Sequence, residues 1–293
     1  MGSETLRIRE IKPVLSGYIS KSRELLKISA VPDEDTIHDI RVFMKKSRAV
    51  LKIAGHVNSE GHQDRDLMSL KQVGQIMSHW RDKSVHRKTL RDLRKEYPSL
   101  FSKIESDEKI AGLMRKPEEV TEPDEEMKSG IMAIDDLLNK TYFRIRFGEI
   151  QKAEAYFLLD QLELSFGAVR NIYLECRNSA RPEKIHKFRK RSKDLLYQMY
   201  FFRPVNPSRI KQVEKRLERL AMNLGKYNDL YQLLKTIGYV YPDEANPPAM
   251  DELVIRIREM QDDYLTGAWK DAYKCFCPGK NLSDLIGFKV VEG

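Results

Sequence analysis

Apolar residues recur along most of the chain at intervals of three and four positions, the spacing of one face of an α-helix. The pattern is clear in the segments LRIREIKPVLSGYISKSRELL from Leu6, AYFLLDQLELSFGAVRNIYLECR from Ala155 and VEKRLERLAMNLGKYNDLYQLLK from Val213. Alternating patterns typical of strands are almost absent. Proline, aspartate, asparagine and glycine mark the breaks between segments, as at Pro32 with Asp33. We therefore predict an all-α protein of about ten helices.

A change in composition divides the chain near its middle. Residues 105–126 contain nine acids, three bases and two prolines, and such a shift is typical of a boundary. We predict a first helical repeat over 1–104, an acidic linker over 105–126 and a second helical repeat over 127–293. The alternative is that the acidic segment folds as a lid over a basic surface.

The two halves of the chain resemble each other in sequence. The segment IHDIRVFMKKSR, which starts at 37, matches IHKFRKRSKDLL, which starts at 185, at an offset of 148 residues. Further along, HWRD from 79 matches KYND from 226 at an offset of 147 residues. The first match pairs His38 with His186, Arg41 with Arg189 and Lys45 with Lys193. Two motifs at a nearly constant offset indicate the internal duplication of a helical bundle.

The matched segments are basic along one helix face. Steps of three and four residues place five side chains within an arc of about 80°, and this first stripe consists of His38, Arg41, Lys45, Arg48 and Lys52. The second stripe, on the equivalent arc, consists of His186, Arg189, Lys193, Tyr197 and Tyr200, with Lys190 just outside it. Neighbouring like charges on a helix each cost roughly 0.2–0.5 kcal/mol, and a bound polyanion would relieve this repulsion. The alternative is that acids from other helices neutralise the stripes.

The composition of the chain favours some kinds of binding partner and argues against metal, disulfide and membrane-spanning features. The net charge of +8 favours an anionic partner. The cysteines Cys176, Cys275 and Cys277 fit no disulfide framework or zinc motif, so we expect a reducing, cytoplasmic environment and neither metal nor cofactor. No segment has the ~18 apolar residues of a membrane helix, and the first residues do not resemble a signal peptide.

The basic segments resemble the signatures of the CHAD domain, the conserved histidine α-helical domain. The first signature, H-x-x-R-V-x-x-[RK]-[RK]-x-R, is matched by His38, Arg41, Val42, Lys45, Lys46 and Arg48. The second, H-x-x-R-K-x-x-K-x-x-R-Y, is matched by His186, Arg189, Lys190, Lys193 and Tyr197, with Leu196 in place of the arginine. A later motif, L-G-x-x-[RN]-D, is matched by Leu224, Gly225, Asn228 and Asp229, and the first copy has Ser78 instead of glycine, followed by Arg81 and Asp82. The resemblance covers nearly the whole chain.

This resemblance implies two pseudo-symmetric four-helix bundles around a basic groove that binds inorganic polyphosphate without catalysis. By motif position, it implies contacts from His38, Arg41, Lys45, Lys46, Arg48, His186, Arg189, Lys190 and Lys193. The stripes add Lys52 and Tyr197, and the segment YFRIRF adds Arg144 and Arg146 as weaker candidates. Because Leu196 leaves the second stripe one charge short, we expect weaker affinity or a shift of the ligand toward the first copy.

Other functions fit the sequence less well. The pair His38 and Asp39 is the dipeptide of metal-dependent phosphohydrolases, but no histidine precedes it, and Asp39 can instead form a capping box with Thr36. We therefore predict a binding protein rather than an enzyme. Binding of a nucleic-acid backbone is one alternative, although the stripes offer little to read or stack on bases. Another is a scaffold that docks an acidic partner, a separate triphosphate- or polyphosphate-processing protein, or a polyphosphate storage granule.

Overall fold

The computed structural model describes residues 8–54, 62–115, 122–147, 155–238 and 248–288, except for the side chains at 62, 79 and 81–84. Within these ranges the chain forms eleven α-helices and one 3-10 helix, and no strand. The prediction of an all-α protein is confirmed. The elements are α1 (Ile11–Leu26), α2 (Glu34–Ala54), α3 (His62–Glu96), α4 (Pro98–Ile104), α5 (Glu108–Met114), α6 (Glu125–Phe147), α7 (Ala155–Asn178), α8 (Pro182–Met199), η1 (Tyr200–Phe202), α9 (Pro207–Ile237), α10 (Pro248–Phe276) and α11 (Leu282–Ile286).

Residues with known capping preferences fix several helix ends. The Asp33 carboxylate accepts a hydrogen bond from the backbone N–H of Thr36 at 2.7 Å, so α2 begins at Glu34. The capping box expected between Thr36 and Asp39 is therefore wrong, because both residues lie inside α2. At the start of α9, Asn206 caps the backbone N–H of Arg209. That helix ends at Gly238, whose φ of 80° is accessible to glycine without strain.

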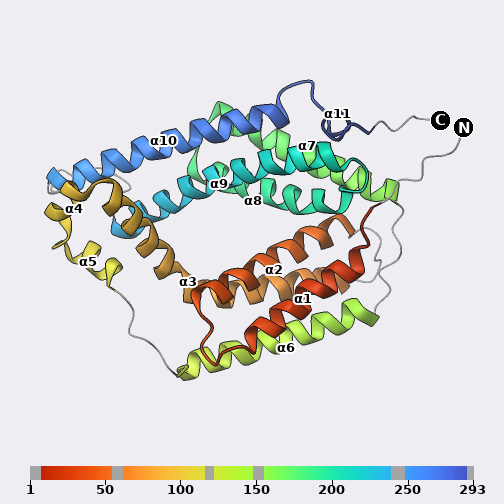
Figure 1. The fold of residues 1–293 in the computed structure, drawn as a ribbon, viewed down its shortest axis with the longest axis horizontal. Helices are drawn as coiled ribbons and strands as arrows, with labels where there is room; N and C mark the ends of the chain where they lie inside the picture. Colours follow the sequence, from red (N-terminus) through yellow and green to blue (C-terminus); the bar gives the residue numbers. More distant parts are fainter. Residues whose placement is uncertain (1–7, 55–61, 116–121, 148–154, 239–247, 289–293) are drawn as a thin grey trace, which may run out of the picture.

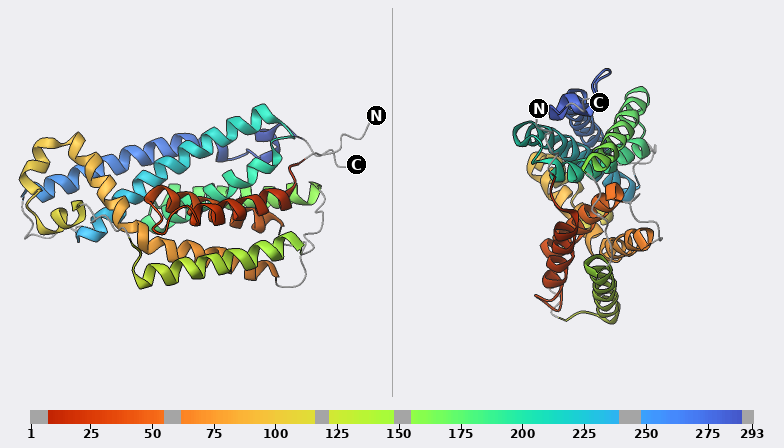
Figure 2. Two further views of the ribbon diagram at one scale, coloured as in Figure 1. Left: turned by 60° about the horizontal axis from the view of Figure 1, so that its bottom comes forward. Right: turned by 90° about the vertical axis from the view of Figure 1, so that its right-hand side faces the viewer.

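The long helices form two groups (Figures 1 and 2). In the first group, α1 packs against α2 and α6, and α3 packs against the same two helices. In the second, α8 packs between α7 and α9, and α10 packs against α9 and α7. The predicted boundary at 105–126 ends at the start of α6, so it separates α6 from the helices that α6 contacts, α1 and α3.

The two groups meet along α2 and α8, which pack against each other. Val50 and Ile53 of α2 are buried in the same apolar cluster as Ile185 and Phe188 of α8. A second cluster joins the end of α3, together with α4 and α5, to α9 and α10. It includes the fully buried Ile110 of α5, so part of segment 105–126 is helical and packed. No helix in the described ranges is long and apolar enough to cross a membrane.

Candidate anion-binding site

The two basic stripes lie on the pair of helices that joins the two groups. In Figure 1, α2 and α8 run in the same direction, so their histidine-bearing first turns lie toward the same end of the molecule. Each helix also packs against the helix that follows it, α2 against α3 and α8 against α9. The stripes are therefore framed by corresponding neighbours.

Arg41 is held by the backbone and a side chain of α3. Its Nη1 donates hydrogen bonds to the carbonyl oxygen of Gly74 and to the hydroxyl of Ser78, each at 2.6 Å. The Ser78 hydroxyl in turn donates to the carbonyl oxygen of Gly74 at 2.9 Å. These bonds are to neutral groups, so they fix the position of the guanidinium without removing its charge.

Arg189 occupies the corresponding place against α9. A Cβ atom added at Gly225 would lie 3.4 Å from Nε of Arg189, so the guanidinium rests on the helix where that glycine lacks a side chain. Gly225 is the family's motif glycine, and Ser78 is its counterpart in the first copy. The motif position thus receives an arginine from the preceding helix in both halves.

His186 is oriented by the same following helix. Its Nδ1 lies 2.9 Å from the side-chain oxygen of Asn228, a motif residue on α9. His38 is likewise exposed near the start of α2. The counterparts of Asn228 and Asp229 are Arg81 and Asp82, and their side chains lie outside the described residues.

Three of the predicted cations have no acidic partner among the described residues: Arg48, Arg189 and Lys190. The Nε atoms of Arg48 and Arg189 are also buried without a hydrogen-bond acceptor. A buried polar donor left without a partner costs about 1–3 kcal/mol, and more when it is charged. The stripes therefore hold positive charge whose hydrogen bonding is incomplete in the unliganded protein.

Lys52, at the end of the first stripe, is neutralised. Its ammonium nitrogen lies 2.5 Å from a carboxylate oxygen of Asp194 on α8, and both side chains are partly buried. Internal neutralisation by an acid from another helix, one of the alternatives considered for the stripes, therefore holds at this residue. The ion pair of Lys52 with Asp194 links α2 to α8.

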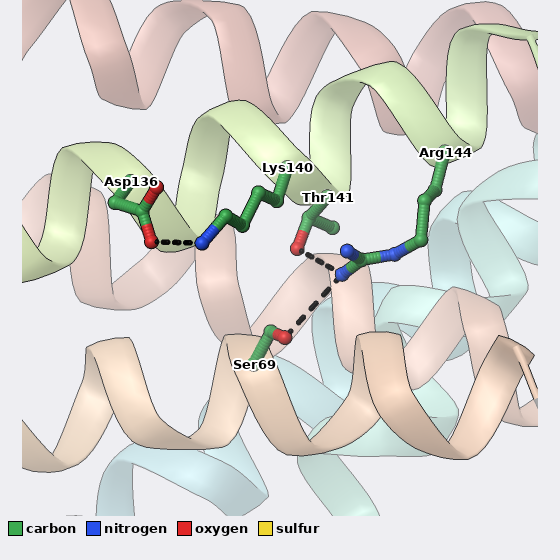
Figure 3. Close-up of polar contacts among 5 residues, drawn as sticks. All are labelled: Ser69, Asp136, Lys140, Thr141 and Arg144. Carbon is green, nitrogen blue, oxygen red and sulfur yellow. Dashed lines mark hydrogen bonds and ion pairs between the residues drawn. The ribbon is translucent and has the colours of Figure 1, made fainter.

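Arg144 and Arg146 of α6 lie apart from α2 and α8. Arg144 pairs through Nε with the buried carboxylate of Asp66 on α3 at 2.6 Å. Figure 3 shows that its Nη2 also reaches the hydroxyls of Ser69 and Thr141, beside the surface pair of Lys140 with Asp136. Arg144 therefore joins α6 to α3.

Arg146 is exposed on α6 and is engaged on its own helix. It donates to the hydroxyl of Tyr142 at 2.5 Å, and its guanidinium lies over the rings of Tyr142 and Phe147. Both α6 arginines thus have local structural contacts, and neither belongs to the stripes.

Lys46 points away from the rest of its motif. One residue further along the helix than Lys45, it is rotated by about 100°, and its ammonium lies 5.6 Å from the ring centre of Tyr18 and 6.0 Å from that of Tyr197. Burial lowers the pKa of Lys46, the nearby Lys21 lowers it further, and Asp39 raises it. The sequence did not indicate that Tyr18, on another helix, contributes to this environment.

Leu196 takes the place of the family's second-copy arginine. It is partly buried and packs against the apolar cluster that joins α2 to α7, α8, α9 and α10. A leucine here adds to the core of the second group, whereas its counterpart Arg48 brings a charge. No group of three or more potential metal-binding side chains occurs in the parts of the chain that are described.

Comparison with known proteins identifies the domain. A model of the CHAD domain matches residues 22–237, well over half of the chain. The match starts within α1 and ends with α9, so it contains both stripes and the helices that frame them. No curated protein matches the chain.

Proposed function

Because the chain belongs to the CHAD domain family, we propose that it binds inorganic polyphosphate along the two stripes and catalyses no reaction. The ligand contacts are assigned to His38, Arg41, Lys45, Arg48, His186, Arg189, Lys190 and Lys193. Lys52 is left out because its charge is paired with Asp194.

The proposal includes a duplicated architecture with a basic groove between the copies. The first copy consists of α1, α2, α3 and α6, and the second of α7, α8, α9 and α10. The order in which these helices pack is the same in both sets, which supports the duplication. In this division the boundary between copies falls between α6 and α7 rather than at 105–126.

The main support for the proposal is that Arg48 and Arg189 have donors without acceptors and charges without an acidic partner among the described residues. Both guanidinium groups have a buried Nε without an acceptor, and neither forms an ion pair within the described ranges. Phosphate oxygens are strong acceptors for guanidinium donors, and such charge-assisted bonds are stronger than neutral ones. Both side chains are partly exposed, so a phosphate chain can accept hydrogen bonds from their Nη groups and balance their charge.

The number of contacts sets the expected affinity. If six of the eight assigned residues contact phosphate and each contributes about 1–1.5 kcal/mol, the sum is about 6–9 kcal/mol, which is in the range of micromolar binding. Because a flexible polyanion releases counterions when it binds, we expect the affinity to fall by about two orders of magnitude between 50 and 200 mM salt. With Leu196 in place of an arginine, the first copy contributes the larger share.

The test is the double variant Arg48→Gln with Arg189→Gln. It removes two charges and leaves polar side chains that can be hydrated. The matched control is Lys211→Gln with Lys215→Gln, which removes the same charge from exposed positions on α9. Binding of medium-chain polyphosphate is measured by calorimetry, with circular dichroism to verify the helices.

We expect the stripe variant to bind at least 30-fold more weakly than the native chain and the control variant to stay within about twofold. Equal losses in both variants would mean that net charge alone attracts the ligand. Undiminished binding in a folded stripe variant would refute the assignment of the site. An acidic protein or a nucleic acid would then be tested as the partner.

A further inference from the structure

Beyond Lys193, the second stripe changes from charged residues to phenols. Tyr197 follows Lys193 by one helical turn, and Tyr200 lies three residues further on the same arc. Cationic and phenolic side chains from four segments gather around these two residues. We call this group the tyrosine–arginine cluster, and it consists of Arg9, Tyr18, Lys46, Tyr197, Tyr200 and Arg203.

Two guanidinium groups lie against Tyr200. Arg9, just before α1, has its guanidinium carbon 4.3 Å from the ring centre, and its Nη1 donates to the Tyr200 hydroxyl at 2.9 Å. The guanidinium carbon of Arg203, just after η1, lies 4.8 Å from the same ring centre. Two cations held this close to one ring repel each other unless a counter-charge is present.

Only one of these cations is neutralised within the described part of the chain. Arg203 donates through Nε to both carboxylate oxygens of the buried Glu214 at 2.9 Å. Arg9 has no ion pair there, and its Nε is buried without a hydrogen-bond acceptor. The same incomplete bonding thus occurs in Arg9 as in Arg48 and Arg189.

Lys46 links the cluster to the stripes. Its ammonium lies near the rings of Tyr18 and Tyr197, and it has no ion pair among the described residues. Burial raises the pKa of Tyr18 to about 12. Burial also raises the pKa of Tyr197, and the nearby Arg189 offsets only part of this rise. The phenols therefore stay protonated at neutral pH and can donate hydrogen bonds to an anion.

We propose that the tyrosine–arginine cluster is a second phosphate-binding subsite, which holds a phosphate group of the same polyphosphate chain beyond the charged part of the second stripe. The proposal rests on the function proposed above and extends it. Arg9 and Lys46 supply the charge, and Tyr18 and Tyr197 supply hydroxyl donors. Tyr200 positions Arg9 through the ring contact and the hydrogen bond.

The first test compares affinities for long-chain polyphosphate and for tripolyphosphate. The variants are Arg9→Gln and Lys46→Gln, and the matched control is Arg191→Gln, an exposed residue of α8 that lies off the second stripe. We expect each cluster variant to weaken long-chain binding by about three- to tenfold and the control to change it by less than twofold. Tripolyphosphate has only three phosphate groups, so a loss of its affinity in the cluster variants would show that the cluster binds phosphate by itself.

The second test locates the ligand directly. The protein is acylated with a limiting amount of acetic anhydride, with and without polyphosphate, and each lysine is quantified by peptide mass spectrometry. We expect polyphosphate to protect Lys46 at least threefold, and to leave unprotected the exposed Lys211 on α9.

The outcomes separate the two proposals. Loss of long-chain binding in the Arg48 and Arg189 variant, with native affinity in both cluster variants and no protection of Lys46, would overturn the subsite and leave the proposed function standing. In that case the cluster only anchors the segment before α1 to η1. Absence of polyphosphate binding in the native chain would overturn both.

Discussion

At the scale of single residues, three arginines in the stripes differ in their surroundings. The Nε atoms of Arg41, Arg48 and Arg189 are all buried without a hydrogen-bond acceptor, but Arg41 also donates through Nη1 to neutral groups of α3. Arg41 therefore contributes to the stability of the unliganded fold as well as to its charge. Arg48 and Arg189 have no acidic partner among the described residues, so a bound anion can balance their positive charge.

This difference predicts that the same substitution has a different effect on stability at Arg41 and at Arg48. Arg41→Gln loses two hydrogen bonds to α3, so we expect the free energy of unfolding to fall by about 1–3 kcal/mol. Arg48 forms no hydrogen bond or ion pair with the residues that the structure describes, so in Arg48→Gln we expect the free energy of unfolding to stay within about 0.5 kcal/mol or to rise. Urea denaturation followed by circular dichroism measures both.

A fall of 2 kcal/mol or more in the Arg48 variant would contradict the account of that side chain. It would mean that the guanidinium stabilises the free protein through its packing. Equal losses in both variants would show that the hydrogen bonds of Arg41 have no special weight.

At the scale of elements, the start of α2 depends on one acid. The Asp33 carboxylate accepts the Thr36 backbone hydrogen bond, which lowers the pKa of Asp33. A lowered folded-state pKa means that this stabilisation is present above the ordinary pKa and is lost as pH falls through the lowered value. The cap also fixes the start of α2 one turn before His38.

We predict that Asp33→Ala lowers the free energy of unfolding by about 1 kcal/mol at pH 7, where the cap is charged. Asp33→Asn keeps an acceptor at the same place, so it should lose less than half as much. The difference between native and alanine chains should shrink as the pH falls below the ordinary pKa of aspartate. Denaturation at neutral and acidic pH checks this, and an equal loss at both would contradict the cap's dependence on charge.

The starts of helices and the helices themselves could be predicted from the sequence, because both depend on residues that are close together along the chain. The Pro32 with Asp33 break correctly marked the start of α2, and the apolar spacing correctly predicted the helices. The capping box at Thr36 failed because the same residue types also occur inside helices. Only the backbone hydrogen bonds decide which acid is the cap.

At the scale of the whole molecule, the pairing of charges lay beyond the sequence pattern. Lys52 fits the first stripe by spacing, yet its partner Asp194 is 142 residues away along the chain. Arg144 is likewise paired with Asp66 on another helix. A helical arc fixes the direction in which a side chain leaves its own helix, but the neighbour that meets it depends on how the helices pack.

The packing also places Arg9 and Tyr18 beside residues far away in the sequence. Arg9 contacts Tyr200, 191 residues further on, and no motif connects them. The region that the family model matches contains both stripe-bearing helices, α2 and α8. The family motifs include Lys46 and Tyr197 of the cluster but neither Arg9 nor Tyr18, which precede the matched region.

The most direct test of the central claim is a titration of the native chain with medium-chain polyphosphate at near-physiological salt. Single-stranded and duplex DNA are added as competitors at matched phosphate concentration. The account predicts micromolar or tighter binding that neither DNA displaces, because closely spaced phosphates can engage both stripes at once. No binding, or equal displacement by DNA, would contradict it and show that the stripes serve another anion.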